Sequence, residues 1–531
     1  MTHWIIAPVI LPALLAPIIG FVMRHDIGLA RAASFAGTIA LLAISVGLTV
    51  MAAGGETFVY ELGNWPAPFG IVLVLDRLAA VMLLLTALLA IVVLLHATAT
   101  GWDARGRHFH ALFQFQLMGV MGAFLTGDAF NLFVFFEVLL IASYGLMIHS
   151  GGRVRMKAGL QYVVMNLAGS TLFLFALGTV YAATGTLNIA DLAEKVRALP
   201  VEDAALVRVA AVLLMMVFAI KAALFPVQFW LPATYSNAPA PVAALFAIMT
   251  KVGAYAIIRV HTIVFGPDVA VTDGLTATWL MPAAVITLAV GAVGVLGARR
   301  LMPLLSFAVV GSMGTMMIAV AAFTPYAMTS ALYYLVHSTF SAAALFLLAD
   351  LVVSRRQGGD LLRAEPPTVQ NGLFAALFFA GAIGMAGMPP LSGFLGKLMI
   401  LDAMKPTPEM VTAWVAILVG SLVTIVGFAR AGSILFWKAT AMAPDASEEA
   451  DAAAEPNAEA DAARRPAGED AAKRPAGAME VAPTVLALAM LVVLAAGAGP
   501  VAQYLEAASG QLFDPAGYVS AVLGGQGEAG Q

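Results

Sequence analysis

Five ionisable side chains lie inside long apolar stretches of this sequence: Glu137, Lys221, Lys251, His337 and Lys397. An ionisable group deep in a bilayer costs several kcal/mol, so such residues are rare and usually functional. Carboxyl, amine and imidazole groups all bind and release protons, and their proton affinities respond to burial and to neighbouring charges. We therefore predict that these five residues form a path for protons.

Each residue also has a structural interpretation. A single buried lysine can be the partner of a carbonyl or a carboxylate, and His337 alone could be a core histidine whose nitrogens are satisfied. Five such groups in separate apolar stretches are harder to explain in this way, because a purely structural helix bundle does not normally bury that many charges in hydrocarbon. Together, the five residues therefore favour a role in proton transport over a structural role.

The composition predicts the setting of these residues. Of 531 residues, 61% are hydrophobic and 11% are charged, and the mean hydropathy is +0.93. An ordinary globular protein is about 25% charged, so the chain is predicted to be an all-α, polytopic membrane protein and not a soluble enzyme. The net charge of −4 leaves no basic face for nucleic acid. The sequence has no cysteine, which excludes disulfides and cysteine-ligated zinc or iron–sulfur centres. We expect no cofactor and no bound metal.

The apolar stretches are long enough to cross a bilayer, which takes roughly 20 residues of helix. We predict fourteen spans, at about 4–23, 30–52, 71–98, 109–127, 129–149, 158–183, 205–225, 239–263, 276–297, 301–322, 327–353, 371–402, 410–437 and 481–505.

Lysine and arginine are concentrated in the loops that follow odd-numbered spans, whereas the other loops hold few of them. Loops rich in these residues stay in the cytoplasm. We therefore predict a multi-pass protein of the cell (plasma or inner) membrane with both termini outside. The basic residues of the cytoplasmic loops are Arg24, Arg31, Arg105, Arg107, Arg153, Arg155, Lys157, Arg299, Arg300, Arg355, Arg356 and Arg363.

Residues 440–480 interrupt the membrane pattern. This stretch has ten acidic and four basic side chains and is rich in alanine and proline, which is too little apolar surface for independent folding. It is predicted to be a flexible cytoplasmic linker, with a small acidic docking element as the alternative. The tail 506–531 is small and glycine-rich and is expected to be mobile.

Two spans carry helix-breaking residues next to a lysine. Pro226 follows Lys221, and Pro389-Pro390 precedes Lys397. Proline frees backbone carbonyls, and transporters use broken helices at ion sites in corresponding positions of inverted repeats. The broken spans are the seventh and the twelfth, five apart, which predicts two inverted five-helix repeats. The expected organisation is 1–108 for spans one to three, 109–263 for the first repeat, 264–439 for the second repeat, 440–480 for the linker, and 481–531 for the last span and tail.

The remaining charges near the spans suggest simpler roles. Arg259 and Arg430 are expected to anchor helix ends, and Asp350 to be solvated at the cytoplasmic end of its helix. Helix capping and interface positions are expected for Asp76, Arg77 and Asp128. The pair His108 and His110 is not expected to bind a metal.

At these residues the chain resembles a known family, the antiporter-like subunits shared by respiratory complex I, membrane-bound hydrogenases and Mrp-type cation/proton antiporters. The resemblance covers nearly the whole chain. It rests on the Glu137 segment after Gly127-Asp128, on Lys221 with Pro226, on the run from Asn237 to Lys251, and on Gly387 to Lys397. Within the family, residues 135–146 look most like the D subunits of Mrp antiporters.

The resemblance implies a function and a partner set. In this family, groups at the places of Glu137, Lys221, Lys251, His337 and Lys397 form a hydrated proton path. The chain would be a non-enzymatic subunit of a multisubunit Na⁺/H⁺ antiporter, with protons and Na⁺ as its substrates. Few carboxylates lie in the spans, so a sodium cage within this chain is not expected.

Two alternatives remain open from the sequence. One is a proton-pumping subunit of a complex I-type NADH-quinone oxidoreductase or a membrane hydrogenase, which redox chemistry in neighbouring subunits would power. The other is a passive subunit that scaffolds a pore elsewhere, in which the buried ionisable groups would be replaceable.

A mechanism follows from electrostatics. A Glu137–Lys221 ion pair would hold Lys221 charged, because an opposite charge favours the charged form of an amine and burial disfavours it. When the pair opens, Lys221 would pass its proton to Lys251, and His337 would carry it to Lys397. The sequence thus predicts a proton wire that one ion pair gates.

The topology is testable by proteolysis. Protease added outside intact cells is expected to leave residues 440–480 uncut, whereas protease added to everted vesicles should cut there. Cleavage of this segment in intact cells would contradict the predicted orientation.

Overall fold

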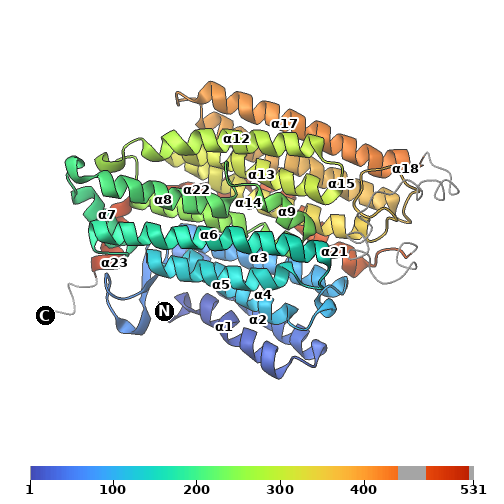
Figure 1. The fold of residues 1–531 in the computed structure, drawn as a ribbon, viewed down its shortest axis with the longest axis horizontal. Coiled ribbons are helices and arrows are strands. Elements are labelled where there is room, and N and C mark those ends of the chain that lie inside the picture. The colour runs from blue at the N-terminus through green and yellow to red at the C-terminus, as the bar shows by residue number, and fades with distance from the viewer. Residues whose placement is uncertain (1, 441–473, 525–531) are drawn as a thin grey trace.

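The computed structural model describes residues 2–440 and 474–524 and is mostly helical (Figure 1). Within the described residues, eleven helical segments are long and apolar enough to cross a membrane. Three shorter apolar helices cover Ala7–Val22, Phe109–Leu125 and Asn371–Ala386. The structure therefore has the helical, polytopic architecture predicted from composition.

The first part of the described chain, up to residue 198, contributes thirteen elements. Its elements are η1 Thr2–Ile5, α1 Ala7–Pro17, η2 Ile18–Val22, α2 Ile27–Ala53, β1 Phe58–Glu61, η3 Leu62–Asn64, β2 Val72–Leu75, α3 Arg77–Ala99, η4 Asp103–Arg105, α4 Phe109–Leu125, α5 Ala129–Met147, α6 Arg153–Thr184 and α7 Ile189–Ala198.

The remaining elements complete the bundle. They are η5 Val201–Asp203, α8 Ala205–Ala222, α9 Trp230–Asn237, α10 Ala240–Phe246, α11 Met249–Ile263, η6 Ala270–Thr272, α12 Leu275–Gly297, α13 Leu301–Ala321, α14 Pro325–Val353, α15 Asn371–Ala386, α16 Ser392–Ala403, α17 Met410–Gly432, η7 Ser433–Trp437, α18 Lys438–Thr440, α21 Ala478–Ala496, α22 Ala498–Leu512 and α23 Pro515–Leu523.

The two ends of the bundle differ in composition. One end holds α7, α23 and the β1–β2 hairpin, in which Phe58 pairs with Leu75 in antiparallel register. The opposite end holds α18 and the beginning of α21 (Figure 1). Here Arg355 bonds to Glu480, and Arg300 forms a backbone bridge with Leu361. We name it the arginine-rich end, because the loops predicted to be cytoplasmic meet there.

Two boundaries differ from the predicted ones, and a third prediction lies mostly outside the described residues. The span predicted from residue 71 begins at Arg77, because 72–75 is a strand and the Asp76 carboxylate caps the helix by accepting from the backbone N–H of Ala79 at 2.8 Å. The tail predicted to be mobile from residue 506 is helical in α22 and α23 as far as Leu523. Most of the predicted linker, 441–473, lies outside the described residues.

Interruptions occur where proline predicted them. The interruption after Lys221 separates α8, which ends at Ala222, from α9, which begins at Trp230. The interruption before Lys397 separates α15 from α16 at 387–391. A third break was not predicted: a turn at 247–248 divides the expected span 239–263 into α10 and α11. The break leaves backbone carbonyls at the end of α10 without helical partners. The Tyr235 hydroxyl satisfies one of them by donating to the Phe246 carbonyl at 2.5 Å.

An ion pair inside the protein joins α3 to α11. The guanidinium of Arg259 donates to both carboxylate oxygens of Asp76, with Nη2 to Oδ1 at 2.8 Å, and its Nε donates to the Tyr255 hydroxyl at 3.1 Å. Both charged side chains are less than 5% exposed. The interpretation of Arg259 as an anchor at a helix end is therefore wrong, because this residue is the buried partner of a carboxylate.

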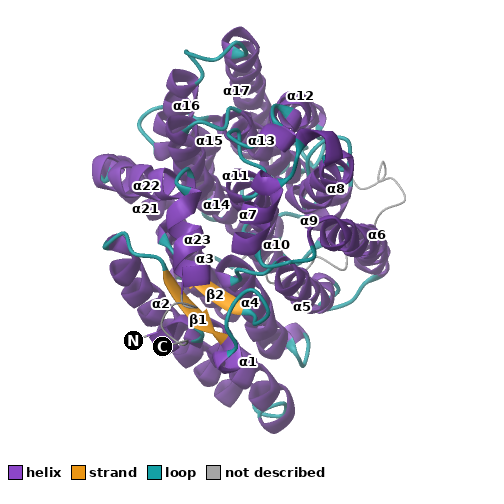
Figure 2. Ribbon diagram, turned by 90° about the vertical axis from the view of Figure 1, so that its left-hand side faces the viewer, coloured by secondary structure: helices purple, strands orange, loops and turns teal. Residues whose placement is uncertain are grey.

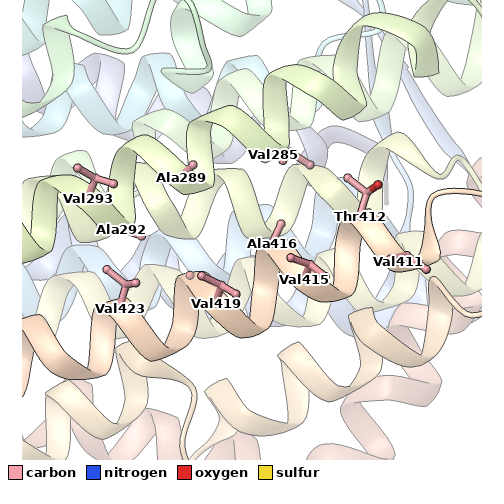
Figure 3. A pocket seen from close by; sticks show the side chains of 11 residues that line it. Val285, Ala289, Ala292, Val293, Val411, Thr412, Val415, Ala416, Val419 and Val423 are labelled. Atoms are coloured by element: carbon pink, nitrogen blue, oxygen red, sulfur yellow. The ribbon is translucent and has the colours of Figure 1, made fainter.

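The outer surface carries apolar grooves. The groove between α12 and α17 has a volume of about 530 Å³, and Figure 3 shows Val285, Ala289 and Val293 on one side and Val415 and Val419 on the other. No ionisable residue lines it. This face suits lipid chains or a partner helix and is not a site for ions.

Removing the charge of Asp76 should destabilise the protein strongly. Asp76→Asn keeps a good helix cap but leaves Arg259 without its carboxylate, and breaking a buried pair in this way costs about 3–5 kcal/mol. The matched control is Asp26→Asn, because Asp26 caps α2 at an exposed position, accepting from the backbone N–H of Leu29. The thermal unfolding temperature in detergent should fall markedly for the first variant only. Equal shifts would contradict the role assigned to the ion pair.

Candidate functional site

Glu137 lies on α5 and is partly buried. It is bound by the hydroxyl of Ser170 on α6, which donates to Oε1. A hydroxyl donor stabilises a carboxylate in an apolar region because it replaces part of the lost hydration. The polar face of α6 thus holds this carboxyl group in place.

Lys221 lies in the last turn of α8 and is 5% exposed. Its Nζ donates to Asn166 Oδ1 at 3.2 Å and lies 5.7 Å from the centre of the Phe136 ring. The Asn166 amide is oriented by a second bond, in which Nδ2 donates to the Tyr162 carbonyl at 2.9 Å. The oxygen of Asn166 is therefore turned toward the amine.

The structure corrects the predicted contact between Glu137 and Lys221. Among the described residues, no nitrogen–oxygen distance of 4 Å or less joins these two side chains. Instead, Asn166 binds the amine and Ser170 binds the carboxylate. These two residues are four apart on α6 and so share one helix face, which makes α6 a polar bridge between the two charges.

Lys251 lies on α11, two residues before Gly253. A Cβ on Gly253 would lie 2.4 Å from the Ala222 nitrogen and 2.9 Å from Lys221 Cβ, so only glycine lets α11 approach α8 so closely. The Lys251 side chain is fully buried, and its Nζ has no hydrogen-bond partner in the part of the chain that the structure describes. An unpaired buried amine is costly, which argues against a structural role for it.

His337 is at the middle of α14 and is fully buried. Its Nδ1 lies 2.8 Å from the hydroxyl of Ser392, the first residue of α16. Its Nε2 lies without a partner among the described residues. A Cβ on Gly393 would be 2.7 Å from this Nε2, so the glycine allows the broken helix to approach the ring.

Lys397 is held by the second helix break. Its Nζ donates to the Ala386 carbonyl and to the Ser421 hydroxyl, both at 2.8 Å. Ala386 ends α15, so its carbonyl has no partner within that helix. Gly387 follows with φ of 78°, and a Cβ there would lie 2.6 Å from Lys397 Cδ. The break thus supplies both an acceptor and space for the amine.

The helices that carry these groups pack in sequence across the bundle. α5 packs on α6, α6 on α8, and α8 on α11, while α10 links α11 to α14, and α14 packs on α16. Figure 2, which views the bundle end-on, shows α11 and α14 near its centre, with α5, α6 and α8 on one side and α15 to α17 on another.

Several polar residues were missed by the sequence reasoning. Asn166, Ser170 and Ser421 sit in apolar spans and carry no charge, so nothing in their type alone marked them. Their positions opposite Lys221, Glu137 and Lys397 become visible only when the helices are packed.

The structure also places the other charged residues. Asp350 was expected to be solvated, but only 13% of its side chain is exposed; it accepts from Trp102 Nε1 at 2.9 Å, and His96 Nε2 lies 2.9 Å from the same oxygen. The expectation is therefore wrong for most of the side chain, and only a small part of the carboxylate reaches solvent. His110 contacts Asp103 at 3.0 Å. Among the described residues, no group of three histidine, cysteine, aspartate or glutamate side chains could hold a metal ion.

Comparison with known proteins places these residues in a family. A family model described as "NADH:quinone oxidoreductase/Mrp antiporter, TM" matches residues 126–424. A relative from Rhizobium meliloti, named as the D subunit of a probable K⁺/H⁺ antiporter, is 37% identical, and the alignment covers 98% of each chain. The D subunit of a Na⁺/H⁺ antiporter from Alkalihalophilus pseudofirmus is 35% identical over 98% of this chain and all of its own.

Solved structures share the fold of this chain. A chain of the Mrp complex from Dietzia sp. DQ12-45-1b is 30% identical, with a TM-score of 0.84 over 98% of this chain and 100% of its own. A chain of respiratory complex I from Thermus thermophilus is 23% identical, with a TM-score of 0.75 over 96% of this chain and 99% of its own, which shows a shared fold.

The bridging role of α6 can be tested by removing its acceptor. Asn166→Leu is similar in size but cannot accept from Lys221, so proton-coupled cation transport should fall by roughly tenfold or more. The control is Thr171→Val, on the same helix, where the hydroxyl only bonds to the Leu167 carbonyl at an exposed position. Transport is measured in everted vesicles, with assembly checked by copurification. Equal activity of the two variants would exclude this role of Asn166.

Proposed function

The chain belongs to the NADH:quinone oxidoreductase/Mrp antiporter family, and from this premise we propose that it is the proton-translocating D subunit of a multisubunit cation/proton antiporter in the cell membrane. Relatives named as D subunits of antiporters match over nearly its whole length. The complex I chain shares the fold at lower identity, so the antiporter assignment is favoured over a redox-driven pump. The relatives' names differ between K⁺ and Na⁺, and the exchanged ion is accordingly an alkali cation, with Na⁺ as the ion expected from the sequence.

The proton path is the finer part of the proposal. It runs through Glu137, Lys221, Lys251, His337 and Lys397. The observation that carries it is the order of these residues on successively packed helices from α5 to α16. Lys251 Nζ and His337 Nε2 are buried and free of protein partners among the described residues, so they are available to exchange protons with each other through water.

The structure modifies the predicted gate. The Lys221 amine donates a hydrogen bond to Asn166, and the Glu137 carboxylate accepts one from Ser170. Movement of the Lys221 amine from Asn166 toward Glu137 would bring it to an opposite charge and keep its proton bound. Movement toward Lys251 would favour release. The gate is then a swing of one flexible side chain across the polar face of α6.

Two inverted repeats of five spans are the proposed frame for this path. Fourteen spans result when the three shorter apolar helices are counted with the eleven longer segments of the described chain. The interrupted helices α8/α9 and α15/α16 run in opposite directions through the bundle (Figure 1). Each lies beside a lysine, which supports the proposed repeats 109–263 and 264–439. With the arginine-rich end in the cytoplasm, both termini lie outside.

Substitution of the path lysines tests the function. Lys221→Ala leaves Glu137 without a nearby cation and should abolish transport while assembly survives. Lys397→Ala should lower transport by roughly tenfold or more. Lys397→Arg keeps the charge but cannot release a proton, so it should be nearly as harmful.

The measurement is cation-driven dissipation of a pH gradient in everted vesicles, with copurification of the partner subunits as the control. If Lys397→Arg is active while Lys397→Ala is not, Lys397 is a fixed charge and the path does not pass through it. If all three variants are active, the chain does not carry the protons.

A further inference from the structure

A second polar site lies at the arginine-rich end, away from the five path residues. It is a cavity of about 320 Å³ between the ends of α3, α14 and α21. The groove between α12 and α17 is apolar, whereas charged and hydroxyl groups line much of this cavity. Its polar lining includes Thr100, Arg105, Asp350, Ser354, Arg355 and Glu480.

The charges in this cavity are unequally paired. Arg355 and Glu480 bond to each other. The Arg105 guanidinium lies over the Trp102 ring, 3.8 Å from its centre. Asp350 has no arginine or lysine within ion-pair distance among the described residues, and its hydrogen bonds are to Trp102 and His96. It is therefore the carboxylate of the cavity that is available to exchange a proton.

His96 forms the inner wall behind Asp350. The imidazole is fully buried, and its Nε2 lies 2.9 Å from Asp350 Oδ2. Its Nδ1 has no partner in the described part of the chain. The carboxylate is 13% exposed while the ring is not exposed at all. The pair thus has one member in contact with solvent and one in the interior, and imidazole is the side chain best suited to pass protons near neutral pH.

α14 connects this pair to the path. It carries both Asp350 and His337, about 20 Å apart along the helix axis at 1.5 Å per residue. α14 packs against α21. Two buried hydroxyls on these helices, Ser341 on α14 and Thr484 on α21, have no partner among the described residues, and neither does His337 Nε2. Unpaired buried polar groups are costly, and water along this interface would satisfy all three.

We propose that Asp350 and His96 form the site at which this subunit exchanges protons with the cytoplasm. A proton from water in the cavity binds the Asp350 carboxylate. With His96 in the tautomer protonated at Nδ1, transfer to Nε2 gives an imidazolium, and release of the Nδ1 proton to interior water leaves a neutral ring and an ionised carboxylate. No charge accumulates, and exchange with water, which takes the Nε2 proton and returns one to Nδ1, restores the first tautomer. The inference rests on the proposed function, since a chain that moves no protons needs no such site.

An isosteric substitution separates proton exchange from structure. In Asp350→Asn, the amide oxygen still accepts from Trp102 and, in the tautomer protonated at Nε2, from His96, but the group no longer ionises. If Asp350 only holds these two residues together, transport should stay near the wild-type rate. If it exchanges protons, transport should fall by at least about tenfold, and Asp350→Glu, which keeps a carboxyl group, should retain much more of it.

Matched variants complete the experiment. His96→Gln removes the imidazole and should lower transport as strongly as Asp350→Asn. Asp402→Asn is the control, because Asp402 is a half-exposed carboxylate near the end of α16 that bonds to Lys405 and Tyr326. It should leave transport unchanged. All are measured as alkali-cation-driven pH-gradient dissipation in everted vesicles that contain the full complex, with copurification as the test of assembly.

The outcomes are distinguishable from failure of the proposed function. Lys221→Ala is measured in parallel: if it is inactive while assembled Asp350→Asn is as active as the wild type, the exchange site is wrong and the path stands. If Lys221→Ala is active, the proposed function itself fails. Should Asp350→Asn not assemble, His96→Gln decides, and retained transport by that variant would overturn the site.

Discussion

The cost of placing a charge in hydrocarbon governs this structure. A lysine in the middle of a bilayer needs an acceptor, and helices have none to spare because their carbonyls are used internally. The three buried lysines meet this requirement in different ways. The end of α15 leaves the Ala386 carbonyl for Lys397. At Lys221 the acceptor is instead a side chain, Asn166, on a neighbouring helix. At Lys251 the described residues supply no acceptor, which is why this amine is the strongest sign of a functional rather than a structural site.

The rest of the bundle can be understood as support for these groups. Glycines allow close approach at two of them, with Gly253 against α8 and Gly387 against Lys397. The ion pair of Asp76 and Arg259 ties α11, the helix that carries Lys251, to the residue that caps α3. Polar contacts that look unrelated to transport therefore determine where the ionisable side chains lie.

The sequence predicted much of the fold and less of the site. The helical spans were predictable because twenty apolar residues in a row have few other solutions in a bilayer. The interruptions beside Lys221 and Lys397 were predictable because proline marks them. The break at 247–248 was not, since no proline or glycine lies at those two positions. The errors on Asp350 and Arg259 have one cause. Both residues are near helix ends, where solvation is the usual outcome, and their partners His96 and Asp76 are about 250 and 180 residues away in sequence. Asn166 and Ser170 were not predicted, because burying an uncharged polar side chain in a span costs much less free energy than burying a charge. Such residues therefore do not stand out in the sequence.

The contact at Gly253 has a mechanical consequence. A side-chain carbon at position 253 would lie 2.4 Å from the Ala222 nitrogen, so α11 and α8 are in close backbone contact directly beside Lys221. This contact fixes the spacing of the two backbone segments that carry Lys221 and Lys251. Rotation within the two lysine side chains changes the spacing of their amines without breaking it. In this view the helix backbones stay in place, and the groups that move are the aminobutyl side chains of the two lysines.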